Sequence, residues 1–414
     1  MPDTIAIGPF SQIVTMHDLP LKGALPDEQL EVIENGALLI QNGRIRAVAD
    51  WETIRQRAKS EEIPWYQLEK PLIAIPGLVD AHTHICYAGS RAKDYAARSA
   101  GKTYLEIAQA GGGIWDTVLK TRSASREVLT ESVLGRTARL LRSGVTTVEV
   151  KSGYALTVEG ELKMLRAIED ANRNSHIDIV STCLPAHIVP RDFGGTAMEY
   201  IKYLLADFFP VVQKEKLAQR ADIFVEAEAF GLAEAEYYLS TLDQRGFDLT
   251  VHADQFITGG SQVAIACQAL SADHLEASGE QEIQALAKSE VIPVALPGAS
   301  LGLGCDFTPG RRLLDAGASL AIASDWNPGS APMGDLLTCA SIFGMAEKLS
   351  LAEILAGINF RAAAALGLHD RGRLVEGQLA DITAFETTDY REIFYQQGQL
   401  RPAMVWKRGQ LIST

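Results

Sequence analysis

The middle of the chain alternates short apolar or β-branched runs with helical stretches, and this pattern constrains the fold more than any other feature. Helical periodicity covers residues 126–141, 162–171 and 280–288, among others. Eight strands that alternate with helices are typical of a (β/α)8 barrel, so the sequence predicts an α/β fold of this type. The eight runs end near His84, Lys151, His187, Glu226, His252, His274, Leu296 and Asp325.

The ends of these runs carry most of the candidate chemistry. Seven of the eight end in or beside an ionisable residue. In barrels of this type the active site lies at the carboxyl ends of the strands. A barrel that is only structural would divide its charged residues between the two faces, so the pattern favours an enzyme.

The first run, over residues 72–84, ends in His82-Thr83-His84. Its near-continuous apolar character is typical of a buried parallel strand. Because side chains alternate along a strand, His82 and His84 are expected to point the same way. Two imidazoles on one side of a strand end form half of a metal site.

Later strand ends supply the other half of this site. His252 and Asp325 complete a set of metal ligands with His82 and His84. Three imidazoles and one carboxylate suit one divalent cation, Zn²⁺ or Fe²⁺, and leave a position for water. Asp325 is also expected to accept a proton from that water, and His274 to bond to the water or to a developing oxyanion.

Both ends of the chain have a different, β-rich character. Residues 36–40 and 44–48 flank an Asn42-Gly43 turn and predict a hairpin. Strand patterns return at 377–385 and 403–412. We therefore expect a small β-sandwich domain made from residues 1–72 and 372–414, and a barrel domain over residues 73–371.

Composition excludes several functions. The net charge of −14 leaves no basic stripe for nucleic-acid phosphates. No apolar run of about 20 residues predicts a membrane span, and the N-terminus lacks the features of a signal peptide. The five cysteines are not paired at close spacing, which favours a reduced, cytoplasmic setting.

The chain resembles the amidohydrolase superfamily in its histidines on the first, fifth and sixth strands and its aspartate on the eighth. The resemblance extends over the whole chain, including the β domain made from both ends. Lys151 falls on the second strand rather than the fourth, where binuclear members carry a carboxylated lysine, so the resemblance implies a mononuclear, deaminase-like branch. Further motifs resemble the imidazolonepropionase family. They are residues 89–91, 102–104, 111–114, 148–154, 186–190, 271–275 and 325–330.

This resemblance implies a hydrolase acting on the carbon–nitrogen bond of a cyclic amide in histidine degradation. Its anionic small-molecule substrate would be 4-imidazolone-5-propanoate and its product N-formimidoyl-L-glutamate. The resemblance also implies a homodimer with one metal ion per subunit. The implied catalytic residues are Asp325, His274 and His187, with His187 polarising the ring carbonyl.

The resemblance implies a set of substrate contacts as well. Arg91 would bind the propionate through its planar guanidinium, with hydroxyls from Tyr104 and Tyr154. Gln255 stands where some members carry Glu; because an amide does not titrate, it is assigned to ring recognition. The ring or product would also contact Asn327, Gly329 and Ser330.

Two alternatives stay open at this stage. Glu226 either orients a ligand or His187, or forms a structural ion pair. The substrate is either the imidazolone or another carboxylate-bearing cyclic amide, amidine or thiohydantoin, because Gln255 and the 298–305 segment leave room for a related ring.

Overall fold

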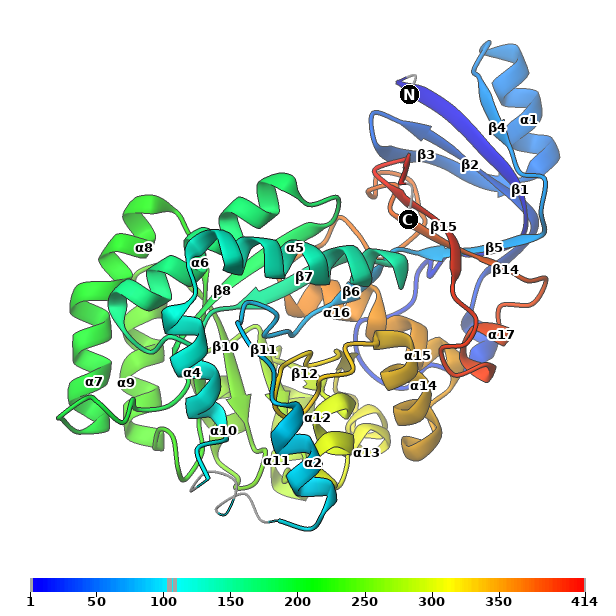
Figure 1. The fold of residues 1–414 in the computed structure, drawn as a ribbon. Coiled ribbons are helices and arrows are strands. Elements are labelled where there is room, and N and C mark those ends of the chain that lie inside the picture. Colours follow the sequence, from blue (N-terminus) through cyan, green and yellow to red (C-terminus); the bar gives the residue numbers. More distant parts are fainter. Residues whose placement is uncertain (1–2, 103–105, 107–109, 413–414) are drawn as a thin grey trace.

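The strands form two sheets in the computed structural model, which describes residues 3–102, 106 and 110–412. The barrel sheet lies at the lower left of Figure 1, and the terminal sheet, built from both ends of the chain, lies at the upper right. Within the described residues each sheet has eight strands.

The barrel sheet confirms the predicted (β/α)8 architecture. Its strands follow one another in chain order, and each is parallel to the next. The ring closes where the backbone N–H of Asp325 donates to the carbonyl of His82 (3.1 Å) and that of His84 donates to Trp326 (2.9 Å). The strands are β6 (Leu78–Asp80), β7 (Val145–Lys151), β8 (Asp178–Ala186), β9 (Arg220–Phe224), β10 (Asp248–Ala253), β11 (Ser271–His274), β12 (Ile292–Ala295) and β13 (Ala321–Ile322).

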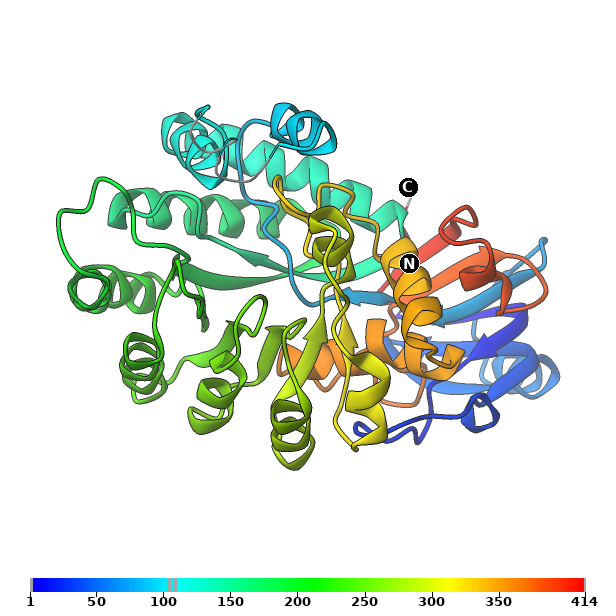
Figure 2. The same ribbon diagram turned by 90° about the horizontal axis from the view of Figure 1, so that it is seen from below.

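Helices cover the outside of the barrel sheet, as Figure 2 shows. The predicted helices are confirmed as α5 (Arg126–Arg142), α6 (Val158–Asn174) and α11 (Glu280–Lys288). Gly144 follows α5 with φ +88°, a left-handed conformation that suits glycine after a helix. The others are α2 (Ala92–Ser99), α4 (Ile114–Ser123), α7 (Ala197–Tyr203), η2 (Leu204–Phe208), α8 (Phe209–Glu215), α9 (Leu232–Asp243), α10 (Gly260–Ala266), α12 (Pro297–Leu303), α13 (Gly310–Asp315), α14 (Leu336–Glu347), α15 (Leu351–Ile358) and α16 (Phe360–Ala365).

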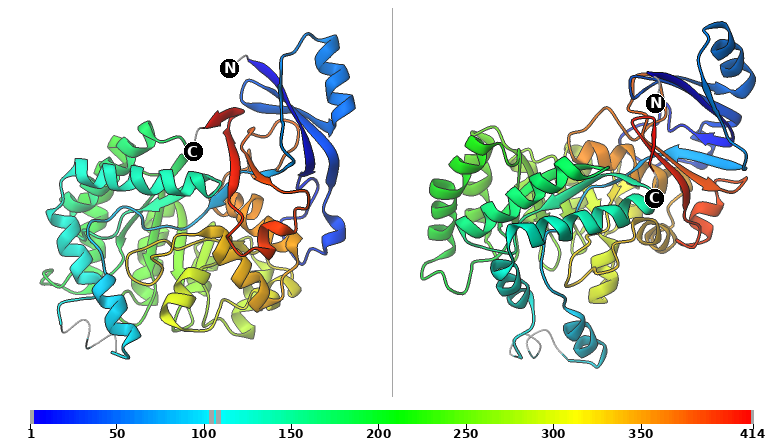
Figure 3. Two further views of the ribbon diagram at one scale, coloured as in Figure 1. Left: turned by 45° about the vertical axis from the view of Figure 1, so that its right-hand side comes forward. Right: turned by 45° about the horizontal axis from the view of Figure 1, so that its top comes forward.

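The terminal sheet confirms that both ends of the chain build one β unit. Its strand order is β16-β15-β14-β5-β1-β2-β3, with β4 paired to β1, and Figure 3 shows α1 at its far end from the barrel. Asn42 and Gly43 both have positive φ and form the predicted hairpin turn. The elements are β1 (Thr4–Val14), η1 (Asp27–Gln29), β2 (Val32–Gln41), β3 (Arg44–Asp50), α1 (Trp51–Ser60), β4 (Trp65–Gln67), β5 (Leu72–Pro76), β14 (Ile382–Glu386), α17 (Glu392–Tyr395), β15 (Pro402–Lys407) and β16 (Gln410–Ile412).

The apolar run that predicted one strand over residues 72–84 is divided. β5 pairs with β1 and β14 in the terminal sheet, and only β6 lies in the barrel. The chain changes sheet at Gly77, where a Cβ would lie 2.4 Å from Oγ1 of Thr146. Periodicity cannot reveal this change, because both halves are fully buried.

A charged cluster joins the two sheets. Asp178, the first residue of β8, contacts Nζ of Lys407 (2.9 Å) and the guanidinium groups of Arg371 (2.7 Å) and Arg408 (2.9 Å). The division into domains at residues 72 and 372 stays a prediction. No helix in the described ranges is long and apolar enough to cross a bilayer.

Candidate active site

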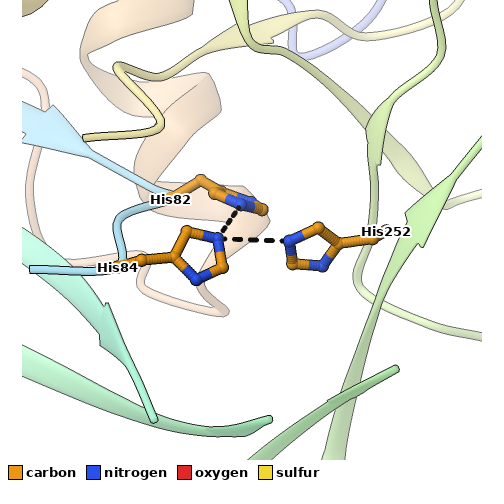
Figure 4. A group of neighbouring side chains, drawn as sticks. All are labelled: His82, His84 and His252. Carbon is orange, nitrogen blue, oxygen red and sulfur yellow. Dashed lines mark hydrogen bonds between the residues drawn. The ribbon is translucent and has the colours of Figure 1, made fainter. Parts of the chain in front are cut away.

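Three histidines converge at the carboxyl end of the barrel sheet. His82 and His84 follow β6, and His252 lies in β10. Nε2 of His84 lies 3.2 Å from Nε2 of His82 and 3.3 Å from Nε2 of His252 (Figure 4). All three are buried. The expectation that His82 and His84 point the same way is confirmed, although neither belongs to the regular strand.

Asp325 brings a carboxylate to the same point. Its Oδ1 lies 3.6 Å from Nε2 of His82 and 3.4 Å from Nε2 of His84. This oxygen is buried and has no hydrogen-bond partner among the residues that the structure describes. Asp325 follows β13 with φ +50°, and Nδ2 of Asn327 donates to its Oδ2 (3.0 Å).

The donors fit a metal ion. Two nitrogens that each lie ~2.0–2.1 Å from a tetrahedral zinc are about 3.3 Å apart, close to the spacings found here. The carboxylate of Asp273 only accepts, so Nδ1 of His82, 2.6 Å from it, carries the proton and Nε2 presents a lone pair. Lone pairs facing one another in a buried site repel unless a cation lies between them.

Burial raises the pKa of the Asp325 carboxyl to about 7. A neighbouring cation would favour the ionised form, which is the form that binds metal and accepts protons. Burial likewise raises the pKa of Asp80 to about 7. Asp80 is the partner of Ser324, whose N–H and hydroxyl both donate to it, and it therefore holds the segment that carries Asp325.

Two carboxylates stand behind the histidines, and the sequence pattern had assigned a role to neither. Asp273 contacts Nδ1 of His82, and Oδ2 of Asp222 lies 2.9 Å from Nδ1 of His252. Such carboxylate–histidine contacts fix the orientation of metal-binding imidazoles. The available signal was the placement of Asp222 and Asp273 inside buried barrel strands.

The two remaining histidines of the site have opposite electrostatic environments. Burial, followed by the proximity of His252, lowers the pKa of His187 to about 3. Burial also disfavours the charge on His274, but Glu276, 3.4 Å from its Nδ1, outweighs this and raises the pKa of His274. His187 is therefore a neutral imidazole, whereas the surroundings of His274 favour its protonated form, in which both ring nitrogens are donors.

The geometry of His187 does not match the role that the resemblance implied. Its Nδ1 lies 3.0 Å from the carbonyl of Gly153, which only accepts, so Nδ1 carries the proton. Nε2 is then an acceptor and cannot donate to a ring carbonyl. The ring stacks on His84, with centroids 5.4 Å apart, which places His187 at the metal site itself.

Several expected substrate-binding residues lie close to the candidate metal ligands or to the turn that follows Asp325. Nη1 of Arg91 lies so close to Gly329 that a Cβ there would be 2.4 Å from it. Asn327 organises this turn, because its Oδ1 accepts from the N–H groups of Gly329 (2.7 Å) and Ser330 (2.8 Å). The ring of Tyr154 is buried, 5.8 Å from that of His84. Tyr104 lies outside the described residues.

Gln255 and Glu226 form a unit that differs from expectation. Oε2 of Glu226 accepts from the N–H groups of Phe256 (3.0 Å) and Ile257 (3.4 Å), which directly follow Gln255. Within the described part of the chain, Glu226 forms no hydrogen bond to a candidate metal ligand or to His187, and it forms no ion pair. It holds the loop after β10 and so positions Gln255, whose side chain is almost buried.

Comparisons with known proteins agree with this site. Residues 103–413 match the amidohydrolase family. The chain is 38% identical to an imidazolonepropionase of Deinococcus deserti, over 99% of both chains, and 37% identical to one of Bdellovibrio bacteriovorus, over 97% of this chain and 95% of that one.

A solved structure agrees in fold. Atrazine chlorohydrolase TrzN from Arthrobacter aurescens TC1, complexed with zinc, superposes with a TM-score of 0.70 at 17% identity, over 98% of this chain and 94% of that one. The family match and the identity to the two imidazolonepropionases show that the chain belongs to the imidazolonepropionase family of the amidohydrolases.

Proposed function

We propose that the protein is a metal-dependent imidazolonepropionase. It adds water to the ring carbonyl of 4-imidazolone-5-propanoate and breaks the adjacent carbon–nitrogen bond, giving N-formimidoyl-L-glutamate. The observation that carries this proposal is the 38% identity to an enzyme of that name over 99% of both chains. The convergence of three imidazoles and one carboxylate supports the hydrolytic chemistry.

The proposed cofactor is one Zn²⁺ or Fe²⁺ per subunit, held by His82, His84, His252 and Asp325. When bound, such a cation polarises the ring carbonyl and lowers the pKa of water toward neutrality. Zinc is supported by the related fold that binds it.

The protein's own residues then move the protons. Asp325 takes a proton from the attacking water and returns it to the ring nitrogen as the carbon–nitrogen bond breaks. His274, held by Glu276, donates to the oxygen on which charge develops. His187 accepts from a ring N–H at Nε2, because its proton is on Nδ1.

Binding falls to the residues around the Asn327 turn. Arg91 pairs with the propionate, with Tyr154 and Tyr104 as further donors, and its Nε is held by Asp94 at 2.8 Å. Gln255 forms hydrogen bonds with the polar edge of the ring. Asn327 holds Gly329 and Ser330 in position beside the substrate. We also propose that the protein is a homodimer, which gel filtration tests, and that it is cytoplasmic.

A coupled assay tests the proposal. Urocanase generates the unstable imidazolone in situ, and its decay is followed with and without the zinc-loaded protein. We expect rapid, chelator-sensitive loss of the imidazolone with formation of N-formimidoyl-L-glutamate.

Folded, metal-loaded protein that does not accelerate the decay would contradict the assignment. In that case other carboxylate-bearing cyclic amides and amidines are assayed next, since Gln255 fits the recognition of a related ring. The Asp325→Asn variant is the control for metal-catalysed decay that does not depend on the site.

A further inference from the structure

Lys151 lies inside the barrel, directly behind the histidines, and the proposed reaction gives it no role. Its side chain has no exposed surface. Its Nζ lies 2.7 Å from Oε1 of Glu149, 2.9 Å from Oδ2 of Asp222 and 4.0 Å from Oδ2 of Asp273. These residues come from β7, β9 and β11, which are alternate strands, and their side chains meet in the barrel interior.

Each of the three carboxylates also contacts a segment that carries a candidate metal ligand. Asp273 contacts Nδ1 of His82 (2.6 Å), and Asp222 contacts Nδ1 of His252 (2.9 Å). Oε2 of Glu149 accepts from the N–H of Thr83 (3.1 Å), the residue between His82 and His84. One ammonium therefore connects to both histidine-bearing segments, in each case through one intervening carboxylate.

Backbone contacts strengthen the same connections. The N–H of Lys151 donates to the carbonyl of Thr83 (3.0 Å), and the Thr83 hydroxyl donates to the carbonyl of Glu149 (2.6 Å). The N–H of His252 donates to Oδ1 of Asp222 (3.2 Å). A shift of the carboxylates would therefore be passed to the imidazoles rather than absorbed by loose packing.

Electrostatic repulsion explains why this cluster of three carboxylates needs a cation. Three carboxylates within reach of one another and shielded from water repel strongly, because their interaction is not screened as it is at the surface. The ammonium lies among them and replaces this repulsion with attraction. Without it, Asp222 and Asp273 would move apart and turn the histidine rings that they hold.

We propose that Lys151 is a positioning residue of the metal site: its ammonium is an internal counter-ion that gathers Glu149, Asp222 and Asp273 and thereby aims Nε2 of His82 and His252 at the cation. This inference rests on the proposed metal site but not on the identity of the substrate. It places Lys151 as a support of the ligands and not as a ligand.

The test compares two buried lysines that differ only in their neighbourhood. Lys407 is nearly buried and pairs with Asp178 (2.9 Å) and Asp381 (2.6 Å), but it lies in the terminal sheet, outside the site. Lys151→Met and Lys407→Met each remove one ammonium and keep a linear apolar chain. The Zn²⁺ dissociation constant of each variant is measured by competition with a chromophoric chelator, and folding is followed by circular dichroism.

We expect Lys151→Met to weaken Zn²⁺ binding by about 10- to 100-fold, as loss of a group that orients ligands does. Lys407→Met should lose thermal stability while its Zn²⁺ affinity stays within about twofold of the original. Methylammonium added to Lys151→Ala should restore affinity in a saturable way, and NaCl at equal ionic strength should not.

Three results would overturn the inference while leaving the proposed metal site intact. One is a folded Lys151→Met variant with unchanged Zn²⁺ affinity. Another is that NaCl restores the Zn²⁺ affinity of Lys151→Ala as well as methylammonium does. The third is failure of both Lys151 variants to fold while Lys407→Met folds, because Lys151 would then serve general stability. A wild-type protein that binds neither Zn²⁺ nor Fe²⁺ would overturn the proposed metal site together with this inference.

Discussion

Each of the two sheets has eight strands among the described residues, but the two sheets fill their interiors differently. The terminal sheet packs apolar side chains such as Phe10 and Trp406 against one another. The barrel sheet holds Lys151, Asp222 and Asp273 with almost no exposed surface. Burying charged groups costs free energy unless they are paired, so this interior is arranged for chemistry at the expense of stability.

Backbone conformation shows the same contrast. In the terminal sheet, the left-handed residues Asn42 and Arg408 lie in hairpin turns. In the barrel, His274 (φ +87°) and Asp325 (φ +50°) take this conformation at strand ends, where they face the site. Such strain persists where surrounding contacts enforce it, and it gathers at functional sites. Substitutions should therefore affect activity in one sheet and stability in the other.

The largest expected effect is that of Asp325→Asn. The amide keeps the shape of the side chain but neither accepts a proton nor neutralises a cation, so kcat should fall by about 10³-fold or more. Steady-state kinetics and circular dichroism check this result. A folded variant that kept more than a tenth of its activity would contradict the contrast between the two sheets. The left-handed backbone at Asp325 would then have no catalytic role.

Trp406→Ala makes the complementary change in the terminal sheet. Trp406 is 1% exposed and contacts Phe10 edge-on, with ring centroids 6.0 Å apart. Removal of a buried aromatic side chain costs about 3–5 kcal/mol of unfolding free energy. Urea unfolding measures this loss, and kcat per folded molecule should not change. A lower kcat in a fully folded Trp406→Ala variant would show that the terminal sheet also shapes the active site.

Arg91→Ala should raise KM by about 10- to 100-fold with little change in kcat, because it removes an ion pair that exists before and during the reaction. Arg166→Ala is the matched control: Arg166 pairs with Glu215 on the outside of the barrel and should leave KM unaltered. An Arg91→Ala variant with unchanged KM would place the propionate elsewhere in the site.

Periodicity in the sequence predicted the barrel and the ends of the chain well. The eight barrel strands, helix α11 and the Asn42-Gly43 turn were predictable because each depends on residues close together in the chain. The division of the 72–84 run at Gly77 was not, because it depends on the distant Thr146.

The site divides in the same way. His82, His84, His252 and Asp325 were predictable as a group, since parallel strands bring their carboxyl ends together. The Lys151 cluster was not, because a buried charged residue can be interpreted only when its partners on other strands are known. For the same reason the tautomer of His187, which depends on the carbonyl of Gly153, could not be predicted.

The smallest expected effect concerns the junction of the sheets, where Asp178 holds Lys407, Arg371 and Arg408. Burial opposes ionisation of Asp178, but these cations outweigh it, Lys407 foremost, and hold its pKa below the ordinary value. A carboxyl with a lowered folded-state pKa stabilises the protein above its unfolded pKa, about 3.9. This stabilisation is lost as the pH falls through the lower, folded-state pKa.

Asp178→Asn should therefore cost about 1–2 kcal/mol of unfolding free energy at pH 7, and this difference should disappear toward pH 2. Urea unfolding at pH 7, 5 and 3 measures it, with Asp389→Asn, which breaks an exposed pair with Arg391, as the control. An equal loss at every pH would mean that Asp178 acts through packing alone. A loss that is equal at pH 7 and pH 5 and smaller at pH 3, with kcat unchanged, would show that the junction stabilises the assembly of the two sheets without serving the chemistry at the opposite end of the barrel.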